Sequence, residues 1–287
     1  MDNPHSTLMN LKFKNWVLSH LIMCLLLALS LQQFFQITHA VAKVAVLDVG
    51  QGDAILIQTP EFKNILIDAG PGSAVIPQIE KQTNFFDRKI DLFILTHPHL
   101  DHFEGLLELL QSYEVHEVLM TGAMTHSPQY LALLETLKQK GIPIHFANNA
   151  EDLQISPDLF LDILYPSAEQ SFIGKEPANP NNASIVARLV RADGTSLMLL
   201  TGDAEQEEER DILLAGADIS APIHKLGHHG SRTSTSPPFL AAVHPKTVVI
   251  SAGKDNSYGH PHPETLEKVK DLEIRQTKEE GTVEFKF

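Results

Sequence analysis

The chain has 287 residues, a formal net charge of −14 at pH 7, 15 histidines and one cysteine. This acidic balance argues against a protein that binds long nucleic acids through an extended basic surface. Cys24 is the single cysteine, so the chain cannot form an internal disulfide. No cysteine follows it, so metal ligands further along the chain must be nitrogen or oxygen atoms. The length is sufficient for a substantial hydrophobic core.

Residues 1–40 are predicted to be separate from the rest of the chain. Lys12 and Lys14 precede an apolar stretch, and Thr38-His39-Ala40 has the small-residue spacing of a signal-peptidase site. The pattern predicts a cleavable signal peptide and an exported protein, either periplasmic or secreted. The alternative is an uncleaved N-terminal membrane anchor, through which alone we expect contact with a membrane.

Residues 41–287 are predicted to form one α/β domain. Strand-like apolar runs occur at 44–49, 54–58, 65–68, 92–96, 118–121, 159–165, 185–190, 197–201, 223–225, 248–252 and 282–287. Helical patterns lie between them at 75–85, 103–112, 129–140, 205–214 and 264–270. Mixed strands and helices at this length indicate two sheets packed face to face with helices outside, a four-layer αββα sandwich.

The most informative motif is H-x-H-x-D-H, formed by His97, His99, Asp101 and His102 directly after a predicted buried strand. Imidazole nitrogens and carboxylate oxygens are ligands that zinc and similar divalent ions prefer. His97 and His99 lie on the same side of an extended segment, so they can bind one ion. Asp101 and His102 come where a helix begins and suit a second ion.

Asp203 ends another apolar strand, beside Gly202. A carboxylate in this position can bridge two ions, and it can also cap the acidic helix that follows. The acidic run Glu205, Glu207, Glu208 and Glu209 is predicted to be a solvated helix face, favourable at the helix N-terminus.

Two further pairs of histidines follow predicted strands. Adjacent residues on an extended chain point to opposite sides, so we favour His228 as a ligand and His229 as a supporting or substrate-contacting group. His260, between Gly259 and Pro261, is a candidate ligand, whereas His262 is expected to open the last helix.

These motifs resemble the metallo-β-lactamase superfamily, and more narrowly the branch that contains the C-terminal domain of the DNA-uptake protein ComEC. The resemblance extends from about Val44 to the end of the chain. It rests on L-D-V-G-Q-G-D-A at 47–54, I-L-I-D-A-G at 65–70, H-x-H-x-D-H at 97–102, N-A-S at 182–184, T-G-D at 201–203, H-H-G-S at 228–231 and Y-G-H-P at 258–261.

The resemblance implies two divalent metal ions, zinc or alternatively manganese. It implies His97, His99, Asp203 and His228 around the first ion, and Asp101, His102, Asp203 and His260 around the second. Most dinuclear members also supply a histidine before the bridging aspartate, where this chain has Asn181, Asn182 and Ser184.

The expected function is metal-dependent hydrolysis of a phosphodiester, in a small molecule or a nucleic acid. Asp101 would orient the nucleophile, and His229 or His262 would protonate the leaving oxygen. Lys225, Arg232 and Lys254 are either phosphate contacts or ordinary surface side chains. The alternatives are hydrolysis of a lactam or ester, and a non-catalytic, metal-stabilised binding module for DNA uptake or envelope assembly.

Overall fold

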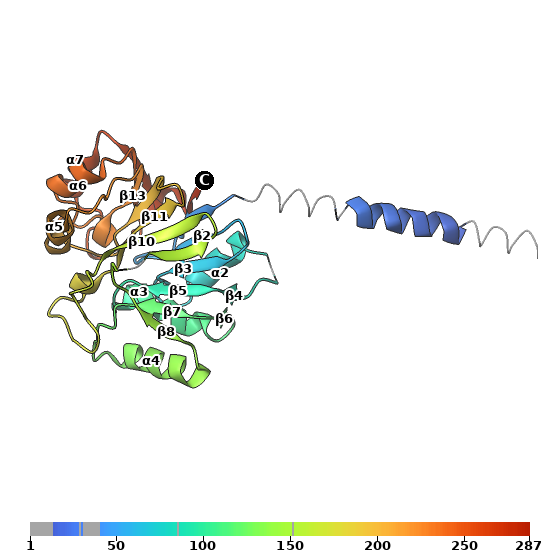
Figure 1. Ribbon diagram of the computed structural model, residues 1–287, viewed down its shortest axis with the longest axis horizontal. Helices are drawn as coiled ribbons and strands as arrows, with labels where there is room; N and C mark the ends of the chain where they lie inside the picture. The colour runs from blue at the N-terminus through green and yellow to red at the C-terminus, as the bar shows by residue number, and fades with distance from the viewer. Residues whose placement is uncertain (1–13, 29, 31–40, 85, 151) are drawn as a thin grey trace, which may run out of the picture. The chain divides into compact units, whose positions relative to one another are not determined.

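The computed structural model describes residues 14–28, 30, 41–84, 86–150 and 152–287 (Figure 1). The chain divides into two units, Met1–Val41 and Ala42–Phe287. Residues 14–28 of the first unit are helical, and no helix in the described ranges is long and apolar enough to cross a membrane. The predicted signal-peptidase motif at 38–40 lies outside the described residues, so the leader stays a prediction.

The second unit contains two large sheets. Within the described residues, the first sheet has seven strands in the order β16-β1-β2-β3-β5-β7-β8. In chain order these are β1 (Lys43–Val46), β2 (Ile55–Gln58), β3 (Asn64–Ile67), β5 (Leu92–Leu95), β7 (Val118–Met120), β8 (Ile144–Phe146) and β16 (Val283–Lys286). A small sheet pairs β4 (Lys89–Ile90) with β6 (Glu114–Val115).

The second sheet also has seven strands in the described part of the chain, in the order β15-β14-β13-β12-β11-β10-β9. They are β9 (Leu153–Ser156), β10 (Leu159–Tyr165), β11 (Val186–Arg191), β12 (Ser196–Leu200), β13 (Ile223–Lys225), β14 (Thr247–Ile250) and β15 (Glu273–Gln276).

Helices cover the outer face of each sheet. One apolar cluster joins the first sheet to α2 (Val75–Gln82), α3 (Leu100–Leu109) and α4 (Pro128–Lys140). Two others join the second sheet to α5 (Gln206–Ala215), α6 (Pro237–Val243) and α7 (Pro263–Val269). A further cluster fills the space between the sheets. The predicted four-layer αββα sandwich is therefore confirmed. The shorter elements are α8 (Thr277–Glu280) and the 3₁₀ turns η1 (Pro180–Ala183) and η2 (Gly227–Gly230).

The central strands are apolar along their whole length because both of their faces are covered. In β5, Leu92 and Ile94 join the cluster between the sheets, whereas Phe93 and Leu95 pack beneath the helices. All four side chains are buried. The continuous apolar runs seen in the sequence are thus strands of a doubly covered sheet.

Parallel pairing brings the chemically important loops to one edge. Strands β3, β5 and β7 are parallel in the first sheet, and β12, β13 and β14 are parallel in the second. The loops after β5, β12, β13 and β14 carry the predicted ligands. Because carboxyl ends of parallel strands lie at the same edge of a sheet, each sheet contributes several polar side chains to a single region.

The acidic start of α5 differs from the prediction of a solvated face. Glu208 and Glu209 are buried. Glu208 accepts a hydrogen bond from the backbone N–H of Glu205 in a capping box, and Glu209 accepts from the backbone N–H of Ser236 at 2.8 Å. These two carboxylates satisfy backbone donors, which the linear charge pattern alone does not reveal.

We expect Glu208→Gln to stabilise the protein at alkaline pH only. Burial raises the pKa of Glu208 from 4.5 to about 7. A raised carboxyl pKa means that stability is complete below about pH 4.5 and is lost as the pH rises through 7. Glutamine keeps the acceptor without the charge, so the variant should gain about 1–3 kcal/mol at pH 8 and little at pH 5. Urea unfolding at both pH values would measure this, with the exposed Glu207→Gln as control. An equal gain at both pH values would contradict it.

Candidate metal centre

The first sheet supplies four of the predicted ligands. His97 and His99 follow β5, and Asp101 and His102 lie in the first turn of α3. The strand end is held by Asp68, which accepts hydrogen bonds from the backbone N–H of Thr96 at 2.8 Å and from its hydroxyl at 2.7 Å. The predicted division of the motif between an extended segment and a helix start is therefore present.

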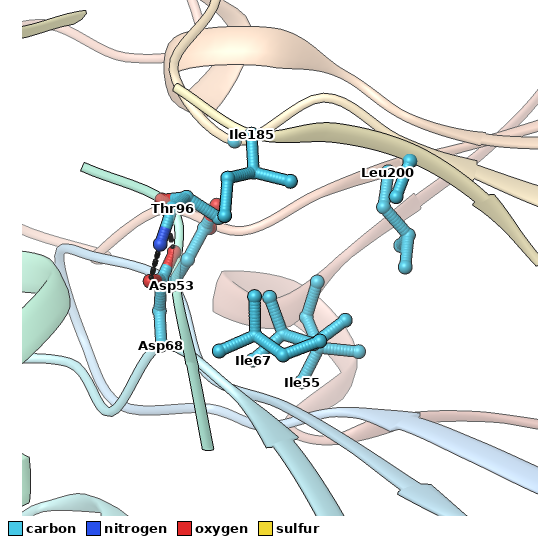
Figure 2. A pocket seen from close by; sticks show the side chains of 10 residues that line it. Asp53, Ile55, Ile67, Asp68, Thr96, Ile185 and Leu200 are labelled. Carbon is cyan, nitrogen blue, oxygen red and sulfur yellow. Dashed lines mark hydrogen bonds between the residues drawn. The ribbon is translucent and has the colours of Figure 1, made fainter. Parts of the chain in front are cut away.

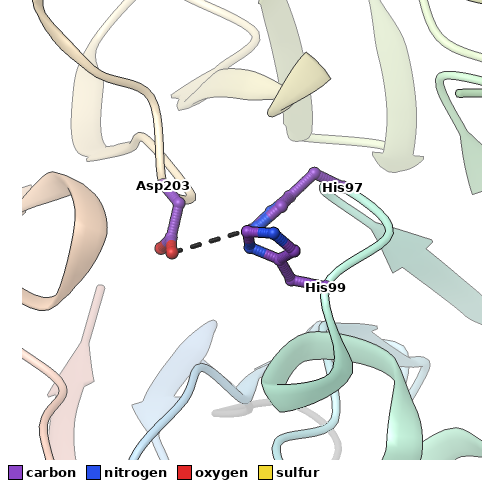
Figure 3. Close-up of side chains that lie close together, drawn as sticks. All are labelled: His97, His99 and Asp203. Carbon is purple, nitrogen blue, oxygen red and sulfur yellow. Dashed lines mark ion pairs between the residues drawn. The ribbon is translucent and has the colours of Figure 1, made fainter. Parts of the chain in front are cut away.

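Asp203, which follows β12, faces these residues from the second sheet. Its Oδ2 lies 3.9 Å from the Nε2 atom of His97, 3.3 Å from that of His102 and 3.5 Å from that of His229. Figure 3 shows Asp203 approaching His97 and His99 from the opposite loop. One carboxylate oxygen thus lies within reach of histidines from both sheets, as a bridging ligand requires.

Three of these imidazoles have their other nitrogen committed to a supporting group. The Nδ1 atom of His102 lies 2.7 Å from Asp68 Oδ2, that of His97 lies 3.0 Å from Thr96 Oγ1, and that of His229 lies 2.9 Å from the carbonyl oxygen of Ser251. A proton on Nδ1 in each ring leaves Nε2 as a lone-pair donor.

Several buried side-chain atoms of the cluster have no hydrogen-bond partner in the described part of the chain. Among the described residues these include Nε2 of His97, His102 and His229, and Oδ1 of Asp203. Buried polar atoms are normally paired, so several orphaned ones aimed at one point fit a bound cation.

Among the described residues, four groups of donors lie close enough to hold an ion, with the donor atoms of each group within 4.8 Å of one another. The first is His97, His99 and Asp203, and the second is Asp101, His102 and His229. A third joins Asp53 and Asp68 to His102. Asp203 also groups with His229 and Asp53. The arrangement fits two divalent ions that share Asp203.

Carboxylates and histidines in the cluster shift one another's pKa values. Burial opposes ionisation of Asp203, but His229 and His102 hold its pKa well below the usual range. Burial opposes protonation of His229, but Asp203 and Asp53 raise its pKa to about 9. Burial and neighbouring His102 lower the pKa of His97 well below normal, which keeps it a neutral donor.

The H-H-G-S segment is a turn and not an extended strand. His228 and His229 both have positive φ, 49° and 55°, a conformation that costs non-glycine residues about 1 kcal/mol or more each. His229 consequently places Nε2 3.5 Å from Asp101 Oδ2. His228 places Nδ1 3.0 Å from Glu205 Oε1 and Nε2 3.9 Å from Asp203 Oδ2.

The geometry favours His229 over His228 as a ligand, because His229 is buried within the second donor group. The sequence argument favoured His228 by assuming an extended backbone, which the turn does not have. His228 belongs to none of the donor groups found among the described residues. Both assignments remain predictions until metal binding is measured.

The family model for the metallo-beta-lactamase superfamily matches residues 47–254, most of the chain. The chain belongs to this superfamily.

The expected resemblance to ComEC-type proteins is also confirmed. ComE operon protein 3 of Bacillus subtilis is 31% identical over 85% of this chain and 33% of its own length. Competence protein ComA of Neisseria gonorrhoeae is 27% identical over 85% of this chain and 32% of its own length. The chain therefore spans about a third of these relatives. Among solved structures, the metallo-beta-lactamase fold protein YhfI of Bacillus subtilis has a TM-score of 0.56 at 12% identity, covering 86% of this chain and all of YhfI.

His260 and His262 lie beside the candidate metal centre and belong to none of the donor groups found in the described part of the chain. The His260 ring centroid is 5.3 Å from that of His228 and 6.1 Å from that of His229, and its Nδ1 has no partner among the described residues. His262 immediately precedes α7, as predicted, and its Nδ1 accepts the backbone N–H of Arg232 at 3.1 Å.

We expect His260→Ala to weaken one of two metal-binding steps and leave the fold intact, if His260 moves onto the second ion when metal binds. Calorimetric titration of metal into the metal-free variant would count the steps. His244→Ala, at the C-terminal end of α6, is the control. Two unchanged tight steps would restrict His260 to a substrate contact.

Three buried residues of the centre were not among the predicted site residues. Asp53 and Asp68 were noted only as parts of glycine-containing motifs, and Lys225 only as a possible phosphate contact. Lys225 is fully buried and ion-paired with Asp53, so it can be neither a phosphate contact nor a surface side chain. A carboxylate at the end of a buried strand, as at Asp68, was the available signal. The pairing of Asp53 with Lys225 has no local signal.

Proposed function

We propose that the domain is a metal-dependent hydrolase of phosphodiesters that uses two divalent ions, zinc or alternatively manganese. The observation that carries the proposal is the convergence of His97, His102 and His229 on one oxygen of Asp203. When bound, two ions would supply an activated water and stabilise the negative charge that develops on the phosphoryl oxygens.

The side chains would divide the work as follows. Asp203 would hold both ions, and His229 would be a ligand of the second ion. Asp101 is less buried than Asp203, with 31% of its side chain exposed, so it can both bind and orient the attacking water. Asp68 and Ser251 fix the rings of His102 and His229.

His262 is the favoured donor to the leaving oxygen. Its Nδ1 accepts a backbone hydrogen bond, so the ring carries an N–H group on Nε2. This group can donate a hydrogen bond to the negative charge that develops on the leaving oxygen, and only the imidazolium form of the ring can transfer a proton to it. We therefore assign His229 as a metal ligand and His262 as the donor to the leaving group, two roles that the sequence left open.

The natural substrate would be a small phosphodiester or a short segment of nucleic acid. The net charge of −14 supports a locally positive site over an extended basic groove. The name of the gonococcal relative, a competence protein, supports a function in DNA uptake at the cell envelope. We propose that the domain is exported, by a cleaved leader or with the N-terminal segment as an anchor.

A metal-resolved activity screen tests the proposal. Zinc- and manganese-loaded protein would be assayed on a chromogenic phosphodiester, single- and double-stranded DNA, a phosphocholine ester and a chromogenic cephalosporin. We expect turnover of phosphodiester substrates that is lost on chelation. Turnover of the cephalosporin alone would identify a lactam hydrolase. Metal binding without turnover of any substrate would support a binding module.

A further inference from the structure

A buried ion pair lies beneath the candidate metal centre. The Lys225 ammonium contacts Asp53, and the two side chains are 0% and 2% exposed. Lysine is almost never fully buried, and removing two charges from water costs several kcal/mol that their attraction only partly offsets. Burial opposes ionisation of Asp53, but Lys225 and His229 keep its pKa below normal. A buried ion pair adds little net stability, so the role of this pair depends on the groups that it holds in place.

On the second sheet, Lys225 holds the turn that carries Asp203. The Thr201 hydroxyl donates a hydrogen bond to the Lys225 carbonyl oxygen at 2.7 Å, and Lys225 Nζ lies 3.4 Å from the Gly202 carbonyl oxygen. Lys225 therefore contacts both residues immediately before Asp203, one through its backbone and one through its side chain.

On the first sheet, Asp53 belongs to a segment packed against Asp101. A Cβ atom on Gly52 would lie 2.2 Å from the Asp101 carbonyl oxygen, so only glycine allows this approach. The Asp53 carbonyl oxygen accepts the backbone N–H of Gly70 at 2.8 Å.

The same segment reaches the support of His229. The Ser251 hydroxyl donates to the Gly52 carbonyl oxygen at 2.7 Å, and Asp53 Oδ1 lies 3.4 Å from His229 Nδ1. Ser251 thus connects the Gly52–Asp53 segment to the carbonyl that orients His229.

A small cavity borders the ion pair. Its volume is about 10 Å³, and it lies against Asp53, Asp68, Thr96 and Gly202 (Figure 2). Apolar side chains from both sheets form its remaining wall, among them Ile55, Ile67, Ile185 and Leu200. These four belong to the apolar cluster between the sheets, so the ion pair lies where this core meets the metal centre.

We propose that the Lys225–Asp53 pair is a positioning device that sets the separation between the metal ligands of the first sheet and Asp203 and His229 of the second. The proposal rests on the metal centre and is independent of which bond the domain hydrolyses. It predicts that removing both charges together restores the stability of the protein but does not restore its metal affinity.

A double-substitution cycle on the full chain tests this role. Lys225→Met, Asp53→Asn and the double variant would be compared by calorimetric zinc titration against a competing chelator and by urea unfolding. We expect Lys225→Met to lose stability and at least about tenfold in zinc affinity, as for other groups that orient ligands. The double variant should regain stability, because no charge is buried alone, yet stay at least about tenfold weaker in zinc affinity.

Zinc titration and urea unfolding also serve for the control variant and identify the results that would contradict the proposal. Lys43→Met removes a cross-strand pair with Glu284 that is partly exposed, and should leave zinc affinity unchanged. Zinc affinity restored together with stability in the double variant would reduce the pair to charge compensation. If Lys225→Met does not fold, Asp53→Asn decides: it retains an acceptor for Lys225 and should lose roughly three- to tenfold in affinity. Wild-type affinity in that variant would overturn the proposal.

Discussion

Replacing Asp203 with alanine is expected to remove most of both metal ions and abolish measurable hydrolysis. The carboxylate belongs to the first donor group and lies within 3.5 Å of two histidines of the second, and its Oδ2 is the common point toward which three histidine Nε2 atoms converge. Without it, each ion loses an anionic ligand, and His97, His102 and His229 lose the group that holds them together. Elemental analysis after gel filtration should show a fall from about two ions per chain to well below one.

The exposed Asp271→Ala is the matched control and should keep its metal. Circular dichroism would verify that the Asp203 variant is folded. Full occupancy of both sites in a folded Asp203→Ala protein would exclude the bridging role and would require separate ligand sets for the two ions.

The second large effect is expected from the two adjacent histidines. His229→Ala should lose the second ion, because His229 is buried with Nε2 3.5 Å from both Asp101 and Asp203. His228→Ala should retain more metal, since its ring pairs with Glu205 and its side chain is 23% exposed. Stepwise titration of zinc into both metal-free variants would separate the assignments.

The variants control for one another because both remove an imidazole from the same turn and both keep a non-glycine residue at a positive φ. Loss of metal in His228→Ala with retention in His229→Ala would restore the assignment favoured by the sequence. Equal loss in both would indicate that the turn, and not a particular ring, holds the metal.

The fold could be predicted because its central strands are continuous apolar runs. The elements that the sequence did not predict have weaker apolar patterns. β9 and β15 are edge strands whose exposed or half-exposed polar residues, such as Gln154 and Glu273, interrupt the apolar pattern. α6 is short and begins with Pro237 and Pro238, which read as a loop although proline is well suited to a first helical turn.

The ligand types of the centre were predictable, but their pairing was not. His97, His99, Asp101 and His102 lie within a stretch of six residues, so local spacing is enough to identify them. The choice between His228 and His229 depends on a left-handed turn, and no alternation rule applies there. The Lys225–Asp53 contact joins residues 172 positions apart, and a contact at this sequence separation cannot be predicted from local spacing.

The pairing of the first strand with the last has a consequence for the order of folding. β1 lies between β2 and β16, with Val44 opposite Phe285 and Val46 opposite Val283. During synthesis, β1 presents an open edge until β16 has been made. The opposing halves of the centre also come from distant segments, with Asp101 on one and His229 on the other. In the proposed centre, an ion held by ligands of both segments would therefore be bound only after His229 has been synthesised and packed against Asp101.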